Sequence, residues 1–164
     1  MNCSISLNFI IQKENETFLA ILDSIRDGSR CRDQIEKMRE YKKTGNQAEY
    51  DKLKRQLPAF TPSGTFLNER KAEALQEHSN IIHLDFDHVP EDQLEDAITA
   101  AKSSPHTYAL FLSPGGDGFK VFIVVKDGQK YHKELFQQIS DHYSELIGFA
   151  PEPDRDWETV TSGA

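Results

Sequence analysis

The chain has 164 residues, of which 37% are hydrophobic and 28% are charged, and its formal net charge at pH 7 is −8. This composition is typical of one soluble globular domain, and no apolar run approaches the roughly 20 residues of a membrane span. The negative net charge argues against a protein that coats nucleic acid without specificity. We expect a cytoplasmic enzyme or binding domain that does not cross a membrane.

Two elements are predicted before residue 30. Apolar residues alternate over 4–12 and predict a strand. Residues 15–27 have the spacing of an amphipathic helix, and Gly28 is placed to end it. Four apolar residues of this helix should face inwards: Phe18, Ile21, Leu22 and Ile25. No signal peptide is indicated, and Cys3 and Cys31 lack the spacing of a zinc site, so both are expected to be free thiols.

The region up to residue 78 is predicted to be mostly helical. Helical patterns around Ile35 and around Tyr50 are separated by turn residues at 43–46. Residues 57–66, LPAFTPSGTF, contain two prolines and a glycine and should be loop or extended chain. Asn68 is a suitable N-cap for a helix that would run to about His78.

Basic residues are concentrated in one segment. From Arg32 to Arg55 there are eight basic and five acidic residues, a local excess of three positive charges, which leaves −11 on the rest of the chain. Two interpretations remain open, a solvated helix face and a phosphate-binding patch. An acidic body with a basic segment permits a local contact with nucleic acid.

The second half has a different pattern. The predicted elements, in order, are a strand over 80–88, a helix over 91–102 after Pro90, strands over 107–113 and 119–125, and a helix over 131–147 ended by Gly148. This β-α-β-β-α order predicts a small antiparallel or mixed sheet with its helices packed on one face, which is an α+β fold.

The first strand of this half carries a polar face. Because side chains alternate along a strand, His83, Asp85 and Asp87 share one face, while the apolar residues between them anchor the strand in the core. Two rigidly held carboxylates can bind Mg²⁺ or Mn²⁺, which prefer oxygen ligands. The alternative interpretation is an ordinary solvent-facing strand.

A glycine-rich turn joins the last two strands. Residues 113–120, SPGGDGFK, contain three glycines, more than a tight hairpin needs. Extra glycines allow a backbone to approach a phosphate closely, and Lys120 can place an ammonium group beside it. A flexible hairpin followed by a lysine with an apolar stem is the other interpretation.

Together these motifs resemble a known family. The order LPAFTPSGTF, IIHLDFDHV, SPGGDGFK and a final helix leading to Gly148 and Asp154 resembles the primase-polymerase-like N-terminal domain of virulence-associated E (VirE) proteins, in the archaeo-eukaryotic primase superfamily. The resemblance covers about residues 15–156 and implies an RRM-like primase-polymerase core. Such domains occur in replication proteins of mobile elements and phages, often before a helicase-like domain.

The resemblance implies roles for particular residues. Metal ligands would be Asp85, Asp87 and Asp154, with Asp156 competing for the third place. The nucleoside triphosphate would be held by Ser113, Gly115, Gly116, Gly118 and Lys120. The wider superfamily generally has histidine where this chain has Lys120, and the arginine-containing segment that usually follows is missing.

The resemblance also implies partners. Single-stranded DNA is the expected nucleic acid, contacted by Lys52, Lys54, Arg55 and the 57–66 segment. We expect one domain over 1–164, with a helical part at about 13–78 and a sheet core at about 79–156, as a fragment of a longer protein.

Three functions are consistent with these expectations. The first is metal-dependent nucleotidyl transfer, in which a triphosphate is the substrate. The second is a non-catalytic domain of the same fold that binds nucleic acid or docks a partner. The third is a metal-dependent nuclease, for which His83 would be the candidate base.

Overall fold

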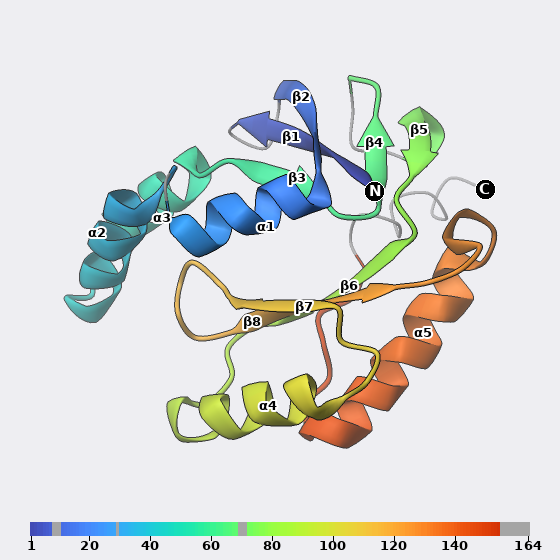
Figure 1. Cartoon of the computed structure of the whole chain (residues 1–164). Helices are drawn as coiled ribbons and strands as arrows, with labels where there is room; N and C mark the ends of the chain where they lie inside the picture. Colours follow the sequence, from blue (N-terminus) through green and yellow to red (C-terminus); the bar gives the residue numbers. More distant parts are fainter. Residues whose placement is uncertain (8–10, 29, 69–71, 155–164) are drawn as a thin grey trace.

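The computed structural model describes residues 1–7, 11–28, 30–68 and 72–154 (Figure 1). Within these ranges the fold is mixed α+β, with five α-helices and small antiparallel sheets. A central sheet has two helices below it and the N-terminal elements above it in the orientation of Figure 1. None of the helices in the described ranges is long and apolar enough to span a bilayer.

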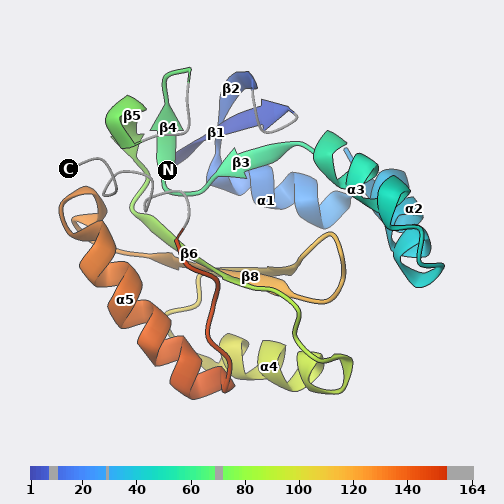
Figure 2. The same cartoon turned by 180° about the vertical axis from the view of Figure 1, so that it is seen from behind.

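The central sheet comes from the second half of the chain. Its strands are β6 (Ile81–Phe86), β7 (Ala109–Leu112) and β8 (Phe119–Val124), in the order β6-β8-β7 with antiparallel neighbours. Helices α4 (Glu91–Ser103) and α5 (Gly128–Ile147) both cover one face (Figure 2). The predicted β-α-β-β-α order and its one-sided helical layer are confirmed.

Local sequence explains these elements. Alternate residues of β6 are buried against the helices, where Leu84 and Phe86 join Val121 and Tyr143 in one apolar cluster. Helix α4 begins directly after Pro90, because proline has no N–H group to leave unpaired at a helix start. Helix α5 ends at Gly148, whose φ of 85° is the left-handed conformation of a helix C-cap.

A second sheet forms at the N-terminus. Strands β1 (Asn2–Leu7), β2 (Ile11–Thr17) and β3 (Ala59–Thr61) pair antiparallel in the order β2-β1-β3. The single strand predicted over 4–12 is therefore wrong in extent, because the chain forms two strands here. The apolar alternation ends before the polar run of β2, which is a strand because it pairs with β1.

Helix α1 (Phe18–Asp27) lies over the face of the central sheet that α4 and α5 leave open (Figure 1). Thr17 caps its start by accepting a hydrogen bond from the N–H of Ala20 at 3.3 Å, and Gly28 ends it with a φ of 65°. Phe18 and Ile21 are buried as predicted, but Ile25 is 39% exposed, so its predicted inward position is wrong. The ring of Phe18 packs 5.2 Å from that of Phe122 in β8.

The next two helices confirm the helical patterns of the basic segment. They are α2 (Arg32–Lys43) and α3 (Gln47–Gln56), separated by the predicted turn. They pack together through Met38, Tyr50 and Leu57. Both cysteines are free thiols, and burial raises the pKa of the Cys3 thiol to about 12.

The helix predicted from Asn68 to about His78 is wrong. Residues 72–74 form a single 3₁₀ turn and β5 (Leu75–His78) is a strand that pairs with β4 (Gly64–Phe66). Asn68 has a φ of 64°, which is not the extended conformation of an N-cap. The described residues of the part at 13–78 thus form four strands besides three helices, and the prediction that this part is mostly helical is incomplete.

Candidate functional site

A cleft of about 1070 Å³ lies between the N-terminal elements and the open face of the central sheet. Residues of α2, α3 and β3 line it from one side, and residues of all three central strands line it from the other. The strands place on it the side chains that face away from α4 and α5. The sequence motifs of the carboxylate strand and of the glycine turn therefore meet in this cleft.

The strand register arranges these motifs in two adjacent rows. In the first row, Lys120 of β8 lies opposite Phe111 of β7 on one side and Asp85 of β6 on the other. Neighbouring strands are roughly 4.8 Å apart, so the three side chains are in immediate reach of one another. The structure brings together a ring, an ammonium group and a carboxylate at the floor of the cleft.

The second row lies next to the first, where the strands end. The N–H of Ser113 donates to the carbonyl of Gly118 at 2.9 Å, and Gly118 lies against the backbone of Asp87. Five of the residues predicted to form the site therefore lie in these two rows: Asp85, Asp87, Ser113, Gly118 and Lys120.

Asp85 and Lys120 form an ion pair across β6 and β8. The Lys120 ammonium group donates to Oδ2 of Asp85, and the two side chains are 26% and 25% exposed, respectively. The other oxygen of this carboxylate, Oδ1, is buried and has no hydrogen-bond partner among the described residues. Because a buried acceptor without a donor is costly, this oxygen is suited to accept a cation or a donor from a ligand.

The second carboxylate of the strand is perturbed by the first. Partial burial of the carboxyl group, and then the negative charge of Asp85, raise the pKa of Asp87. The positive charges of Lys120 and Lys54 act in the opposite direction. Two neighbouring carboxylates that repel each other in this way would gain from a shared cation.

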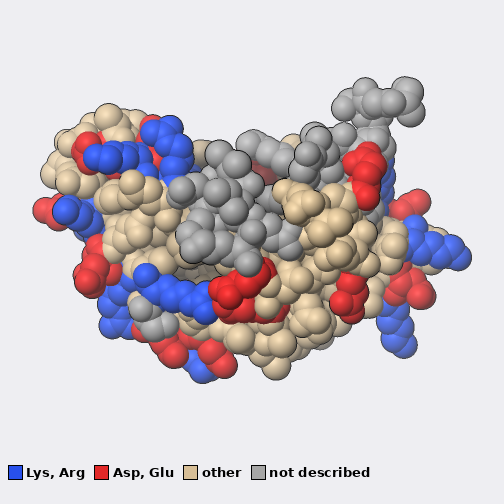
Figure 3. All heavy atoms as spheres, turned by 90° about the horizontal axis from the view of Figure 1, so that it is seen from above, with Lys and Arg blue, Asp and Glu red and all other residues tan. Residues whose placement is uncertain are grey.

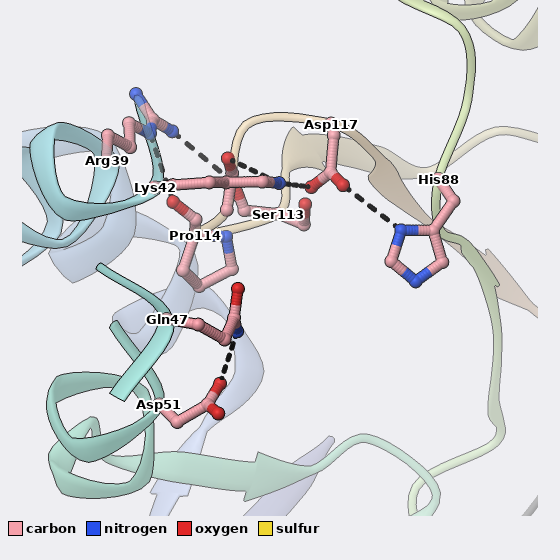
Figure 4. A network of polar contacts seen from close by, with 9 residues as sticks. Arg39, Lys42, Gln47, Asp51, His88, Ser113, Pro114 and Asp117 are labelled. Carbon is pink, nitrogen blue, oxygen red and sulfur yellow. Dashed lines mark hydrogen bonds and ion pairs between the residues drawn. The ribbon is translucent and has the colours of Figure 1, made fainter. Parts of the chain in front are cut away.

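The glycine turn is held by side chains of α2 (Figure 4). Arg39 Nε donates to the carbonyl of Pro114 at 3.0 Å, and Lys42 Nζ lies 3.4 Å from the carbonyl of Gly115 and 2.7 Å from Oδ1 of Asp117. Burial raises the pKa of Asp117, but the hydrogen bond and charge of Lys42 outweigh it and hold that pKa below its usual range. Two of the basic residues expected on a free surface are thus used within the protein.

The glycines of this turn are explained by close approach. A Cβ at Gly115 would lie 2.7 Å from the hydroxyl oxygen of Tyr50, and one at Gly118 would collide with the carbonyl oxygen of Phe86. Gly116 has a φ of 78°, which glycine adopts without strain. The packing of this turn accounts for all three glycines, and their predicted contact with phosphate stays a prediction.

The remaining basic residues do not share one face. Lys54 lines the cleft, with its ammonium group 5.8 Å from the centre of the Tyr50 ring. Lys52 points elsewhere and lies 3.4 Å from a carboxylate oxygen of Glu49, and Arg55 is exposed outside the cleft lining. On the face seen in Figure 3, the basic side chains of the described residues lie mainly towards the two ends of the view, with acidic side chains beside them.

Burial describes two further expected site regions, whose roles stay predictions. Residues 61–66 of the predicted template-binding segment are buried in and between β3 and β4, and the residues of the segment that line the cleft are 57–60 and Pro62. His83 also lines the cleft and is partly buried, with the centre of its ring 6.1 Å from that of Phe122.

Asp154 also lines the cleft, but its carboxylate makes a separate contact. Oδ2 accepts a hydrogen bond from Nε2 of His132 at 2.7 Å, and Nδ1 of His132 lies 2.9 Å from Nε2 of His78. Within the described ranges, no group of three His, Cys, Asp or Glu side chains is arranged to hold a metal ion, so the three predicted ligands do not form one cluster. Asp156, the competing candidate, lies outside the described residues.

No motif in the sequence indicates this histidine pair. His78 and His132 are 54 positions apart, one at the end of the helix predicted up to residue 78 and the other near the start of the helix predicted over 131–147. The feature that the two histidines share is that each is a polar residue in a buried position. That feature can be recognised only once the fold is known.

The molecule is thus an α+β domain with a cleft, lined by both charged and apolar side chains, over one face of an antiparallel sheet. A comparison with known families matches residues 52–156 to the BT4734-like, N-terminal domain, and the chain belongs to this family. Comparison with curated proteins and with solved structures gave no match.

Proposed function

We propose that this chain is a primase-polymerase-like domain of a mobile-element or phage-type replication protein. In this proposal it binds a nucleoside triphosphate with Mg²⁺ or Mn²⁺ in the cleft and transfers the nucleotide to nucleic acid. The observation that carries it is the convergence of Asp85, Asp87, Ser113, Gly118 and Lys120 in two adjacent rows of the sheet.

The topology of the sheet supports the RRM-like part of the proposal. The N–H of Glu152 donates to the carbonyl of Asp85 at 2.7 Å, so the segment after α5 runs beside β6. A fourth strand at this position would complete the β-α-β-β-α-β order of that class. Its sheet would then place β6, which carries Asp85 and ends directly before Asp87, in the centre.

The residues present fit one divalent cation. Asp85 offers a buried oxygen without a partner, and Asp87, which directly follows the end of β6, is close enough for the charge of Asp85 to raise its pKa. A bound cation would neutralise charge on the phosphates of the substrate. Lys120, which faces the same carboxylate, would release Asp85 and contact a phosphate as a point charge.

A non-catalytic binding domain of the same fold is the second candidate. Two contacts favour it: Lys120 is paired with Asp85, and Asp154 is bonded to His132. Both contacts engage carboxylates that a two-metal mechanism would need. In this candidate, nucleotide or nucleic acid binds without transfer.

Calorimetric titration tests the binding step. We expect wild type to bind a nucleoside triphosphate in the presence of Mn²⁺, and Asp85→Asn with Asp87→Asn to weaken that binding at least ten-fold. Glu95→Gln with Asp96→Asn is the matched control, because these residues are exposed on α4, which covers the opposite face of the sheet. Equal affinities for wild type and the β6 double variant would contradict the site.

Primer extension on single-stranded DNA separates the two candidates. Incorporation of nucleotide that is lost in the β6 double variant supports the enzyme. Triphosphate binding without incorporation supports the binding domain. For the nucleic acid itself, Lys54→Glu should reduce binding more than Lys52→Glu, because only Lys54 lines the cleft, and both should be measured at two salt concentrations.

A further inference from the structure

Three polar side chains form a continuous chain of hydrogen bonds at the end of β6 away from the glycine turn. We call His78, His132 and Asp154 the histidine chain. The residues His78 and His132 are 7% and 5% exposed, and the side chain of Asp154 is 10% exposed. The histidine chain joins the end of β5, the first turns of α5 and the segment that follows α5.

The hydrogen atoms of this chain are fixed by its first member. The N–H of Asn80 donates to Nδ1 of His78 at 3.0 Å, so this nitrogen is an acceptor. Nε2 of His78 must then carry the proton that it donates to Nδ1 of His132. Nε2 of His132 in turn donates to Asp154, so both rings are neutral, with the proton on Nε2.

The segment that the histidine chain reaches packs through Phe149 against the apolar cluster of the central sheet, but it offers few backbone donors. In the sequence Pro151-Glu-Pro153 two residues have no N–H group, so Glu152 is the one backbone donor of the three. That donor bonds to the carbonyl of Asp85 at 2.7 Å. A strand with alternate prolines cannot form a regular ladder, so one backbone bond must be supplemented by side chains.

We propose that His132 and His78 are positioning residues, which dock the segment 149–154 on the edge of β6 and set the place of the Asp154 carboxylate at the rim of the cleft. The docked segment bonds to the backbone of Asp85 itself. Docking therefore also steadies the strand that carries the candidate metal ligand. The part of the inference that concerns ligand binding rests on the proposed function, whereas the docking does not.

Hydrogen exchange at the Glu152 amide, measured by NMR on the whole chain, reports the docking directly. In His132→Phe the ring shape stays but both hydrogen bonds are lost, and we expect exchange at Glu152 to become at least ten-fold faster. His132→Gln keeps a donor and an acceptor and should recover part of the protection. His142→Phe, on the same helix but exposed, is the control and should leave exchange unchanged.

Asp154→Ala provides a second test if His132→Phe does not fold. It removes the acceptor at the end of the histidine chain without changing a core residue, and it should also expose the Glu152 amide. Nitrogen chemical shifts of the imidazole rings in wild type should show Nε2 protonated in both histidines. Unchanged Glu152 exchange in every folded variant, or protonation of Nδ1 in His132, overturns the proposal.

Titration with a nucleoside triphosphate and Mn²⁺ distinguishes docking from function. If wild type binds and Asp154→Ala binds at least five-fold more weakly, the carboxylate position matters for the ligand as proposed. If wild type does not bind, the proposed function fails, and faster Glu152 exchange in the variants still supports the docking. If Asp154→Ala binds as well as wild type, the ligand-binding part of the inference is overturned.

Discussion

The two ends of β6 are held by polar contacts of opposite character. At one end, Lys42 of α2 pairs with Asp117 of the glycine turn, and these side chains are 36% and 34% exposed. At the other end, His132 bonds to Asp154, and these side chains are 4% and 10% exposed. The first contact joins two formal charges in contact with water, whereas the second belongs to a buried chain with neutral rings.

This difference predicts different strengths. Exposed ion pairs contribute roughly 0–1 kcal/mol and are screened by salt. A buried donor or acceptor that loses its partner costs about 1–3 kcal/mol. We therefore expect the segment 149–154 to be held firmly and the glycine turn to be held more loosely, although both line the same cleft.

The strongest test of this contrast is His132→Phe. The substitution leaves the N–H of His78 and the carboxylate of Asp154 without their partners, so we expect a loss of about 2–4 kcal/mol in the free energy of unfolding. Urea denaturation measures it. The exposed His142→Phe loses only its 3.3 Å contact with Ser104 Oγ and should cost no more than about 1 kcal/mol. A similar loss in both variants would show that the histidine chain has no special weight.

Low pH should weaken the buried end. Burial, followed by the neighbouring His132, lowers the pKa of His78 to about 4, against an ordinary value near 6.5. Between about pH 6.5 and pH 4, His78 therefore takes up a proton in the unfolded protein but not in the folded protein. The contribution of neutral His78 to the free energy of unfolding is complete above about pH 6.5. As the pH falls towards 4, up to about 3 kcal/mol of it is lost.

The pH dependence is measured by urea denaturation between pH 7.5 and 4. His78→Gln does not titrate, so the loss of stability on acidification should be smaller in this variant than in wild type. Parallel curves for the two proteins would show that His78 titrates normally in the folded state.

Gly118→Ala tests how the turn end depends on close packing. A Cβ there would collide with the carbonyl oxygen of Phe86, so the turn must move away from β6, at a cost of about 1–3 kcal/mol. Thermal unfolding measures the loss. Gly45→Ala is the comparison, because that glycine has open space around it and only its φ of 74° opposes the substitution.

The smallest effect is expected for Lys42→Met. The variant loses the ion pair with Asp117 but keeps most of the apolar stem, so stability should fall by no more than about 1 kcal/mol. In 0.5 M salt the difference from wild type should largely disappear. A loss that persists at high salt would mean that the hydrogen bond to the Gly115 carbonyl, rather than the charge, holds the turn.

Local patterns predicted the second half of the fold well. The alternation in β6, Pro90 before α4 and Gly148 after α5 act within a few residues, and the structure confirms each of them. The first half was harder, since β2 and β5 are polar strands that form by pairing with distant partners. No periodicity of burial marks such strands in the sequence.

The candidate site shows the same division. Asp85 and Lys120 lie opposite each other on one face, and strand alternation in the sequence predicts the cleft-facing position of Asp85. Arg39 and Lys42 are used inside the protein because α2 lies against a turn more than 70 positions away. No local pattern in the sequence predicts that contact. The position of the Asp154 carboxylate likewise depends on two histidines, which lie near it only in the folded protein.

The two edges of the central sheet also differ in how they meet solvent. The segment 149–154 covers the outer edge of β6, whereas β7 is the last strand on the other side of the described sheet. Its sequence, ALFL, has neither lysine nor proline to discourage a further strand, and Leu112 is 45% exposed. In concentrated samples this edge is where copies of the chain would associate strand to strand, so Leu112→Lys is the first substitution to make when the protein is prepared for crystallisation.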